Sequence, residues 1–193
     1  MKLLSKTVVV VLAMFSLFTG CTKRAAATAT APPPLLTAAA SVRAELNLPA
    51  ELPPGGCKSV NGFPDATCTP GEVNPNVTQS NIKTTICVSG YTATVRPPTS
   101  YTNGLKVQQI HEYGYTDTNP SDYEEDHFIP LELGGNPTDP RNLWPESPPN
   151  PNPKDSVETK LKRLVCANKI TLEDARRLIR TNWKTAVQEA TAK

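Results

Sequence analysis

The chain has 193 residues, of which 38% are hydrophobic and 6% aromatic, and 20 of them are proline. This size allows one ordinary domain with appendages, and the proline content argues against a helical bundle. The formal net charge of +2 excludes a strongly basic or acidic chain, but the charge is divided unevenly. Residues 101–150 carry nine acidic and two basic side chains, whereas residues 151–193 carry ten basic and five acidic ones. An acidic surface can bind a cation and a basic one can contact phosphates, although two solvated surfaces would give the same pattern.

The first 20 residues have the pattern of a signal peptide. Two lysines precede an apolar run, residues 7–18, that is too short to span a bilayer comfortably. The Gly-Cys pair that follows resembles a bacterial lipobox, which predicts a lipid on Cys21, and ordinary secretion is the alternative. Residues 21–54 are rich in Ala, Thr and Pro and predict a flexible linker. We therefore expect a protein that is lipid-anchored on the periplasmic or extracellular side of a bacterial envelope, or else secreted.

Four further cysteines, in a compartment of that kind, allow three disulfide pairings. Pairing Cys57 with Cys68 closes a small loop. Pairing Cys87 with Cys166 ties a predicted β region to a predicted helix, and a loop of that length contributes ~4 kcal/mol in the chain-entropy model. A zinc site is the rival interpretation, but the chain contains no Cys-x-x-Cys pair.

Residues 86–113 predict short strands and one helix. Residues 86–88 and Tyr91–Val95 flank a Ser-Gly turn and are rich in β-branched and aromatic residues, which favours strands. Residues 101–113 are loosely periodic and predict a helix. His111 lies in that helix, and a lone histidine is more often a surface or packed residue than a ligand.

Two helices are expected after the proline-dense link at residues 145–153. The first runs from about Lys154 to about Asn168 and carries apolar residues on one face. The second begins at Thr171, where an acidic residue three positions later is a helix-start signal. Its predicted buried stripe consists of Leu172, Ala175, Ile179, Trp183 and Ala186. Trp183 is expected in the core rather than in base stacking, because that is the usual role of Trp on an apolar helix face.

The most informative stretch is Asp126-His127, followed by an apolar run, a Gly-Gly breaker and Asn142. This pattern predicts two strands that flank a loop. Neighbouring side chains on a strand point to opposite faces, so both can serve one site only where the strand ends or bulges. A carboxylate is a good ligand for a hard divalent cation, and a histidine near neutral pH can accept a proton from water. These are the minimum parts for metal-assisted hydrolysis.

Asp126-His127, Pro130, Gly134-Gly135 and Asn142-Leu143 resemble the first two thirds of the HNH endonuclease, or ββα-metal, motif. Residues 69–183 also resemble a secreted bacterial HNH-like family of unknown biology. The resemblance implies an α+β domain at residues 55–193 with a ββα-metal core at residues 121–168, extra N-terminal strands and two C-terminal helices. It further implies that Asp126 binds the metal, that His127 activates water and that Asn142 holds the loop between the strands.

The resemblance also implies a last ligand from the helix, usually His or Asn, but no histidine follows Asn142. Asp155 is the favoured substitute, followed by Asn150, and Glu158 is a further candidate metal ligand. Lys154 could instead contact a phosphate. We expect Arg141, or a basic residue of the C-terminal helices, to offset the charge of the phosphate.

The predicted function is that of a metal-dependent endonuclease acting outside the cytoplasm on DNA or RNA without sequence specificity. The cofactor is expected to be Mg²⁺, with Mn²⁺ or Zn²⁺ as alternatives, and the protein is expected to be a monomer without an organic cofactor. One alternative is a non-catalytic envelope lipoprotein that uses a degenerate HNH-like fold as a binding or structural module. Another is a hydrolase of a different phosphodiester, such as teichoic acid or a lipid headgroup.

Overall fold

The computed structural model describes residues 52–147 and 152–192, which belong to a unit that comprises residues 34–193. Helices and one two-stranded antiparallel sheet make up this part of the chain, so the predicted α+β class is confirmed. The predicted signal peptide, Cys21 and the linker up to residue 51 lie outside the described residues. These three features stay predictions.

In chain order, the elements are the 3₁₀ helix η1 (Gln79–Thr84), α2 (Tyr91–Val95), α3 (Thr99–Glu112), η2 (Pro120–Asp122), β1 (Glu124–His127), η3 (Leu131–Leu133), η4 (Pro140–Asn142), β2 (Leu143–Glu146), α4 (Pro153–Cys166), α5 (Leu172–Asn182) and α6 (Ala186–Thr191). In the sequence, the two strands of the sheet lie between helices α3 and α4.

The predicted N-terminal strands are wrong. Tyr91–Val95 is the short helix α2, and residues 86–88 form turns. Ile86 is fully buried in the hydrophobic core, and the neighbouring Cys87 is bonded to Cys166. Ile86 therefore serves tertiary packing, whereas Val88 is exposed. A strand also needs a partner edge for its backbone groups, and the described sheet consists of β1 and β2 alone, with α3 packed on both strands.

The predicted helices near residues 101–113 and 154–168 are confirmed as α3 and α4. Helix α4 begins with Asn152 as N-cap, whose side chain accepts a hydrogen bond from the Lys154 backbone N–H at 2.9 Å, and with Pro153 in the first turn. Helix α5 begins after Thr171, whose hydroxyl accepts from the Asp174 backbone N–H at 3.0 Å. Local capping chemistry thus fixes where both helices start.

The apolar stripe predicted on the second C-terminal helix is buried throughout. The chain turns at Trp183, however, and continues as a separate helix, α6. Trp183 lies in the core, as predicted, and its indole N–H donates to the Gly62 carbonyl at 3.0 Å. The C-terminal region therefore has one more helical segment than expected.

Both expected disulfides are present, Cys57–Cys68 and Cys87–Cys166. The second joins the turn after η1 to the last residue of α4. Such bonds persist in oxidising compartments, so they indicate a location outside the reducing cytoplasm. Within residues 52–147 and 152–192, no helix has the length and apolar character needed to cross a bilayer.

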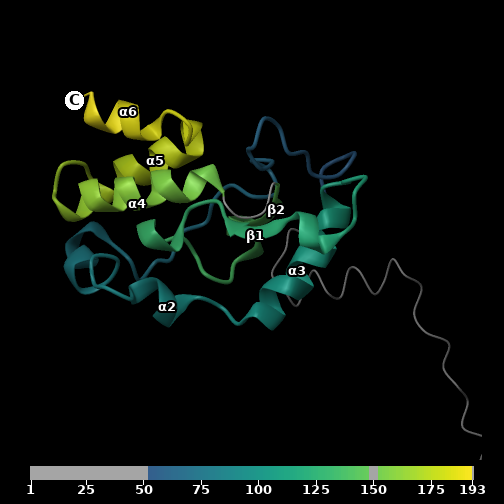
Figure 1. Cartoon of the computed structure of the whole chain (residues 1–193), viewed down its shortest axis with the longest axis horizontal. Coiled ribbons are helices and arrows are strands. Elements are labelled where there is room, and N and C mark those ends of the chain that lie inside the picture. Colours follow the sequence, from purple (N-terminus) through teal and green to yellow (C-terminus); the bar gives the residue numbers. More distant parts are fainter. Residues whose placement is uncertain (1–51, 148–151, 193) are drawn as a thin grey trace, which may run out of the picture. The chain divides into compact units, whose positions relative to one another are not determined.

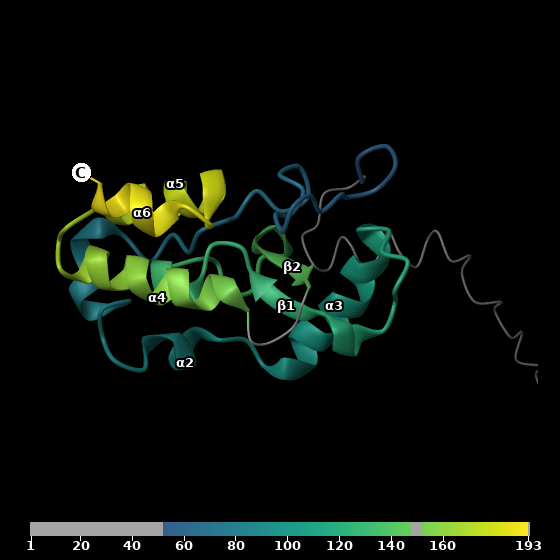
Figure 2. The ribbon, with the colours of Figure 1, turned by 45° about the horizontal axis from the view of Figure 1, so that its top comes forward.

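The β1–β2 hairpin lies between α3 and the N-terminal end of α4 (Figures 1 and 2). Helix α3 packs on both strands, α4 packs on η3 in the loop between the strands, and α5 and α6 pack on α4. One core cluster joins the loop residues Ile129 and Leu133, Trp144 of β2, and Leu161 and Ile179 of the C-terminal helices. The start of α4 is thereby placed beside the end of β1.

Candidate functional site

Asp126 and His127 occupy the last two positions of β1. They pair with Trp144 and Leu143 of β2 in the antiparallel ladder. The strand ends at His127, and the chain then enters the loop that contains η3. Both residues line one open cavity of about 270 Å³, so neighbouring positions serve the same site because the strand stops there.

Asn142 holds the loop that leaves this strand. Its side chain is fully buried, its Oδ1 accepts from the Ile129 backbone N–H at 2.9 Å, and its Nδ2 donates to the Ile129 carbonyl at 3.0 Å. Nδ2 also donates to the Asn136 carbonyl at 3.0 Å. Asn142 does not line the cavity. It acts as a positioning residue, because it fixes the backbone just after His127.

The Gly-Gly pair makes this loop sterically possible. Gly134 has a φ of 69°, in the left-handed region. A Cβ on Gly135 would lie 1.8 Å from the Ile129 carbonyl oxygen and 2.7 Å from Asn142 Nδ2. Gly135 is therefore required, because any side chain there would collide with Ile129 and with Asn142.

His127 is oriented by the same loop. Its side chain is buried, and its Nε2 lies 3.0 Å from the Pro137 carbonyl oxygen. A carbonyl oxygen only accepts, so Nε2 is the protonated nitrogen and Nδ1 of the neutral ring is left as an acceptor. Burial holds the pKa of His127 below its usual value, an effect that the Pro137 carbonyl and Asp126 partly offset. The ring is therefore neutral at neutral pH and can take up a proton.

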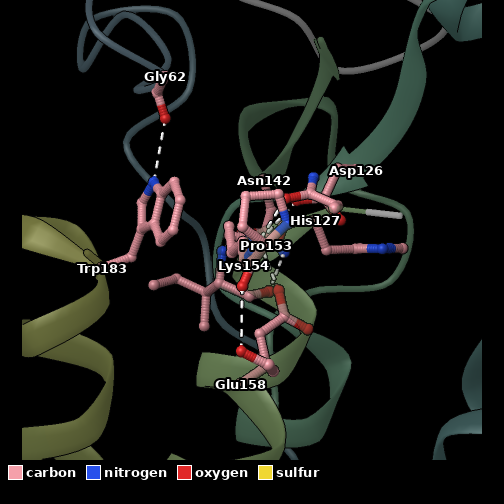
Figure 3. Close-up of polar contacts among 11 residues, drawn as sticks. Gly62, Asp126, His127, Asn142, Pro153, Lys154, Glu158 and Trp183 are labelled. Carbon is pink, nitrogen blue, oxygen red and sulfur yellow. Dashed lines mark hydrogen bonds and ion pairs between the residues drawn. The ribbon is translucent and has the colours of Figure 1, made fainter. Parts of the chain in front are cut away.

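Lys154, at the start of α4, occupies the space beside Asp126. Its Nζ donates to Asp126 Oδ2 at 2.6 Å, to Glu158 Oε1 at 2.6 Å and to the His127 carbonyl at 3.0 Å (Figure 3). Its side chain is 1% exposed. Burial alone would lower the pKa of Lys154, but the surrounding carboxyl groups raise it overall, so the ammonium stays charged. Burial alone would raise the pKa of Asp126, but the same ammonium, together with a hydrogen bond from Glu146 and the nearby His127, lowers it overall.

Glu146, the last residue of β2, adds a further carboxyl group to this cluster. Burial and the nearby Asp126 raise the pKa of Glu146 to about 8, and the two carboxyl groups share a hydrogen bond. Burial and Asp126 likewise raise the pKa of Glu158 to about 7, although Lys154 opposes the shift. At neutral pH, Glu146 therefore retains its proton and can donate it to the Asp126 carboxylate.

The remaining candidate residues are divided between this cavity and other places. Asp155 is exposed and lines the cavity, where burial and Asp126 raise the pKa of its carboxyl group, and Glu158 also lines it. Arg141 lies elsewhere, paired with Asp139 at 2.9 Å and with Glu72 at 3.3 Å. Asn150 lies outside the described residues.

Arg96 is a site residue that the sequence interpretation missed. It lines the 270 Å³ cavity and also a neighbouring one of about 310 Å³, and the two cavities share His127, Glu124 and Glu125. Arg96 is exposed, so its guanidinium is accessible to a ligand. It follows α2, about 30 positions before His127 in the chain, and no spacing rule links segments that far apart.

The fit of a divalent cation depends on Lys154. Its ammonium already lies between Asp126 Oδ2 and Glu158 Oε1, so an ion held by this pair of candidate ligands would have to displace it. Among the described residues, no group of three or more His, Cys, Asp or Glu side chains is placed to hold an ion. The side chains as arranged do not fit an ion there unless Lys154 withdraws. The predicted divalent cation stays a prediction.

Other carboxyl groups around the cavity have unused oxygens. Glu124, Glu125 and Glu132 line it, and each has at least one buried oxygen without a hydrogen-bond partner among the described residues. Burial raises the pKa of both Glu124 and Glu125, and the nearby Asp126 adds to the effect. Protonation or a cationic ligand can satisfy such groups.

The chain was compared with family models, with curated proteins and with solved structures, and none of the three comparisons gives a match.

Proposed function

We propose that this protein hydrolyses phosphodiester bonds of nucleic acid outside the cytoplasm, with His127 as the general base. The observation that carries the proposal is the orientation of the His127 ring. His127 Nε2 donates to the Pro137 carbonyl at 3.0 Å, which leaves Nδ1 as the acceptor of the neutral ring, and His127 lines an open cavity. A neutral imidazole held in this way is suited to take a proton from an attacking water.

The local architecture supports an HNH-like assignment. Asp126 and His127 end the first strand, a Gly-Gly loop held by Asn142 follows, and a helix that begins near the second strand contributes Lys154 and Glu158 to the same site. This is the order of parts that the ββα-metal resemblance implies. The helix-borne group that meets Asp126 is an ammonium, where a carboxylate or amide ligand was expected.

In the proposed reaction, His127 Nδ1 accepts a proton as the water oxygen forms a bond to phosphorus. The ester bond between phosphorus and the leaving oxygen breaks, and that oxygen takes a proton from solvent. Arg96 binds the phosphate and offsets its charge, because it lines the cavity and is exposed. Arg141 was predicted for this role, but it is engaged by Asp139 and Glu72.

The test is a cleavage assay on plasmid DNA, single-stranded DNA and RNA, with Mg²⁺, Mn²⁺ or Zn²⁺ and with a chelator alone. His127→Ala is expected to lower the rate about 100-fold or more, the usual contribution of a general base. His111→Ala is the matched control, since His111 is exposed on α3. Cleavage by folded His127→Ala at the wild-type rate would remove this residue from the mechanism.

Two other results would redirect the proposal. Hydrolysis of a small phosphodiester without cleavage of nucleic acid would point to a teichoic-acid or lipid-headgroup substrate. A folded protein that hydrolyses none of these substrates would support the non-catalytic alternative, an envelope module with a degenerate HNH-like fold.

We further propose that the protein is lipid-anchored through Cys21 to the bacterial envelope. The supports are the residues that precede this cysteine and the oxidising compartment that the disulfides indicate. Labelled fatty acid should be incorporated into the wild-type chain and not into Cys21→Ala. Equal labelling of both chains would contradict the anchor.

A further inference from the structure

We infer that Lys154 is the built-in cation of this site, so that the Asp126–Glu158 position accepts a divalent ion only when the lysine side chain is removed. The contacts of the ammonium carry the inference. All three of its N–H groups are used, on oxygens from two side chains and one backbone carbonyl. Three oxygens around one buried cation are what a small metal ion would receive at the same point.

The position of Lys154 along α4 shows that the helix itself does not favour the charge. Lys154 is the second residue of the helix, and Asn152 caps its backbone N–H at 2.9 Å. A helix N-terminus carries partial positive charge and disfavours a cation. The Asp126 carboxylate and the Glu158 carboxyl group therefore hold the ammonium in place against the helix dipole.

Lys154 already occupies the point between Asp126 and Glu158, where a divalent ion would compete with its ammonium. Lys154 pairs with Asp126 and Glu158, and the neighbouring Glu146 shares a hydrogen bond with Asp126. The side chain of Lys154 is 1% exposed and that of Glu158 is 13% exposed, so solvent screens the pair weakly. Removing the ammonium would leave buried carboxylates without a partner, and a divalent cation could then take its place.

The position of Lys154 beside Asp126 predicts how activity depends on added metal, provided that the proposed function holds. If His127 and Arg96 hydrolyse a phosphodiester, cleavage should proceed in the presence of a chelator, because the cation beside Asp126 belongs to the chain. Lys154 then acts as a positioning residue, since its three N–H groups are all bonded within the protein.

The experiment compares the full-length protein with Lys154→Met and with Lys160→Met, an exposed lysine on the same helix. The Tm and the binding isotherm are measured with Mg²⁺, Mn²⁺, Zn²⁺ or chelator. Wild type and Lys160→Met should keep the same Tm in every condition. Lys154→Met should lose about 10 °C in chelator and regain most of it with Mn²⁺ or Zn²⁺.

Ion binding by the wild-type protein tests the inference even if Lys154→Met is unfolded in chelator. Saturable binding of one divalent ion by wild type, lost in Asp126→Asn, would overturn the built-in cation while leaving the proposed hydrolysis intact. Failure of every ion to restore the Tm or the fold of Lys154→Met would also overturn it. The expected thermal results together with no hydrolysis of any substrate would keep the inference and reject the proposed function.

Discussion

The side-chain amide of Asn142 binds both backbone polar groups of Ile129, accepting from the N–H at 2.9 Å and donating to the carbonyl at 3.0 Å. This pair of hydrogen bonds joins the end of the loop to its beginning. It lies two residues after His127, so the orientation of the imidazole depends on an amide that does not itself line the cavity. Loss of the Asn142 hydrogen bonds would therefore disturb the position of His127.

Asn142→Ala should destabilise the protein by about 3 kcal/mol, because it leaves the N–H and carbonyl of Ile129 and the carbonyl of Asn136 without a partner in a buried place. Urea unfolding measures this loss. Asn103→Ala, on the exposed face of α3, should change the free energy of unfolding by less than about 0.5 kcal/mol. Equal effects of the two substitutions would contradict the role of Asn142 in holding the loop.

Two glycines should respond to alanine in opposite directions. Gly135→Ala should prevent the native loop from closing, because its Cβ would lie 1.8 Å from the Ile129 carbonyl oxygen. Gly104→Ala should stabilise the protein by about 0.5–1 kcal/mol, because Gly104 lies within α3 with open space around it. The Tm of each variant tests both statements, and a Gly135→Ala variant as stable as wild type would refute the first.

Stability should fall as the pH rises through the titration range of Glu146. The pKa of this carboxyl is raised from 4.5 to about 8 in the folded protein, mainly by burial and next by Asp126. Below about pH 4.5 the group is protonated in both states, so its contribution is complete. Between that pH and about 8 the unfolded chain releases the proton first, and the contribution is lost.

Glu146→Gln keeps the shape of the side chain and removes this titration. Urea unfolding of wild type and variant from pH 5 to 9 should therefore show a smaller loss of stability in the variant. Glu189→Gln, on the exposed face of α6, should behave as wild type. A variant curve parallel to that of wild type would show that Glu146 does not carry the pH dependence.

Arg96→Ala should weaken phosphodiester hydrolysis about 10-fold or more in kcat/KM, the effect of losing a charge-assisted hydrogen bond to phosphate. Arg141→Ala is the matched control, because its guanidinium is engaged by Asp139 and Glu72 away from the cavity. Steady-state cleavage of a fluorogenic oligonucleotide measures both variants. A larger loss in Arg141→Ala would restore the original assignment of the phosphate contact to Arg141.

The hairpin and the C-terminal helices were predictable because their signals are local. Thr171 and the apolar spacing of α4 and α5 act within a few residues of the backbone they direct, and the structure adds Asn152 as the cap of α4. The segment at residues 86–95 misled the sequence interpretation, since its β-branched residues fit a strand equally well. The described sheet consists of β1 and β2 alone, so the segment has no partner edge, and Tyr91–Val95 forms the helix α2.

The sequence by itself determined that Asp126 and His127 lie on a strand before a Gly-Gly loop and that a helix follows from about Lys154. The tertiary structure alone decided which groups meet there. Arg96 and Lys154 reach the site from segments separated from it by about 30 residues on either side, and their approach depends on how α3 and α4 pack around the hairpin. The sequence pattern of a segment reflects its local backbone preference. The contact of Lys154 with Asp126 and Glu158 depends instead on how separate segments pack together.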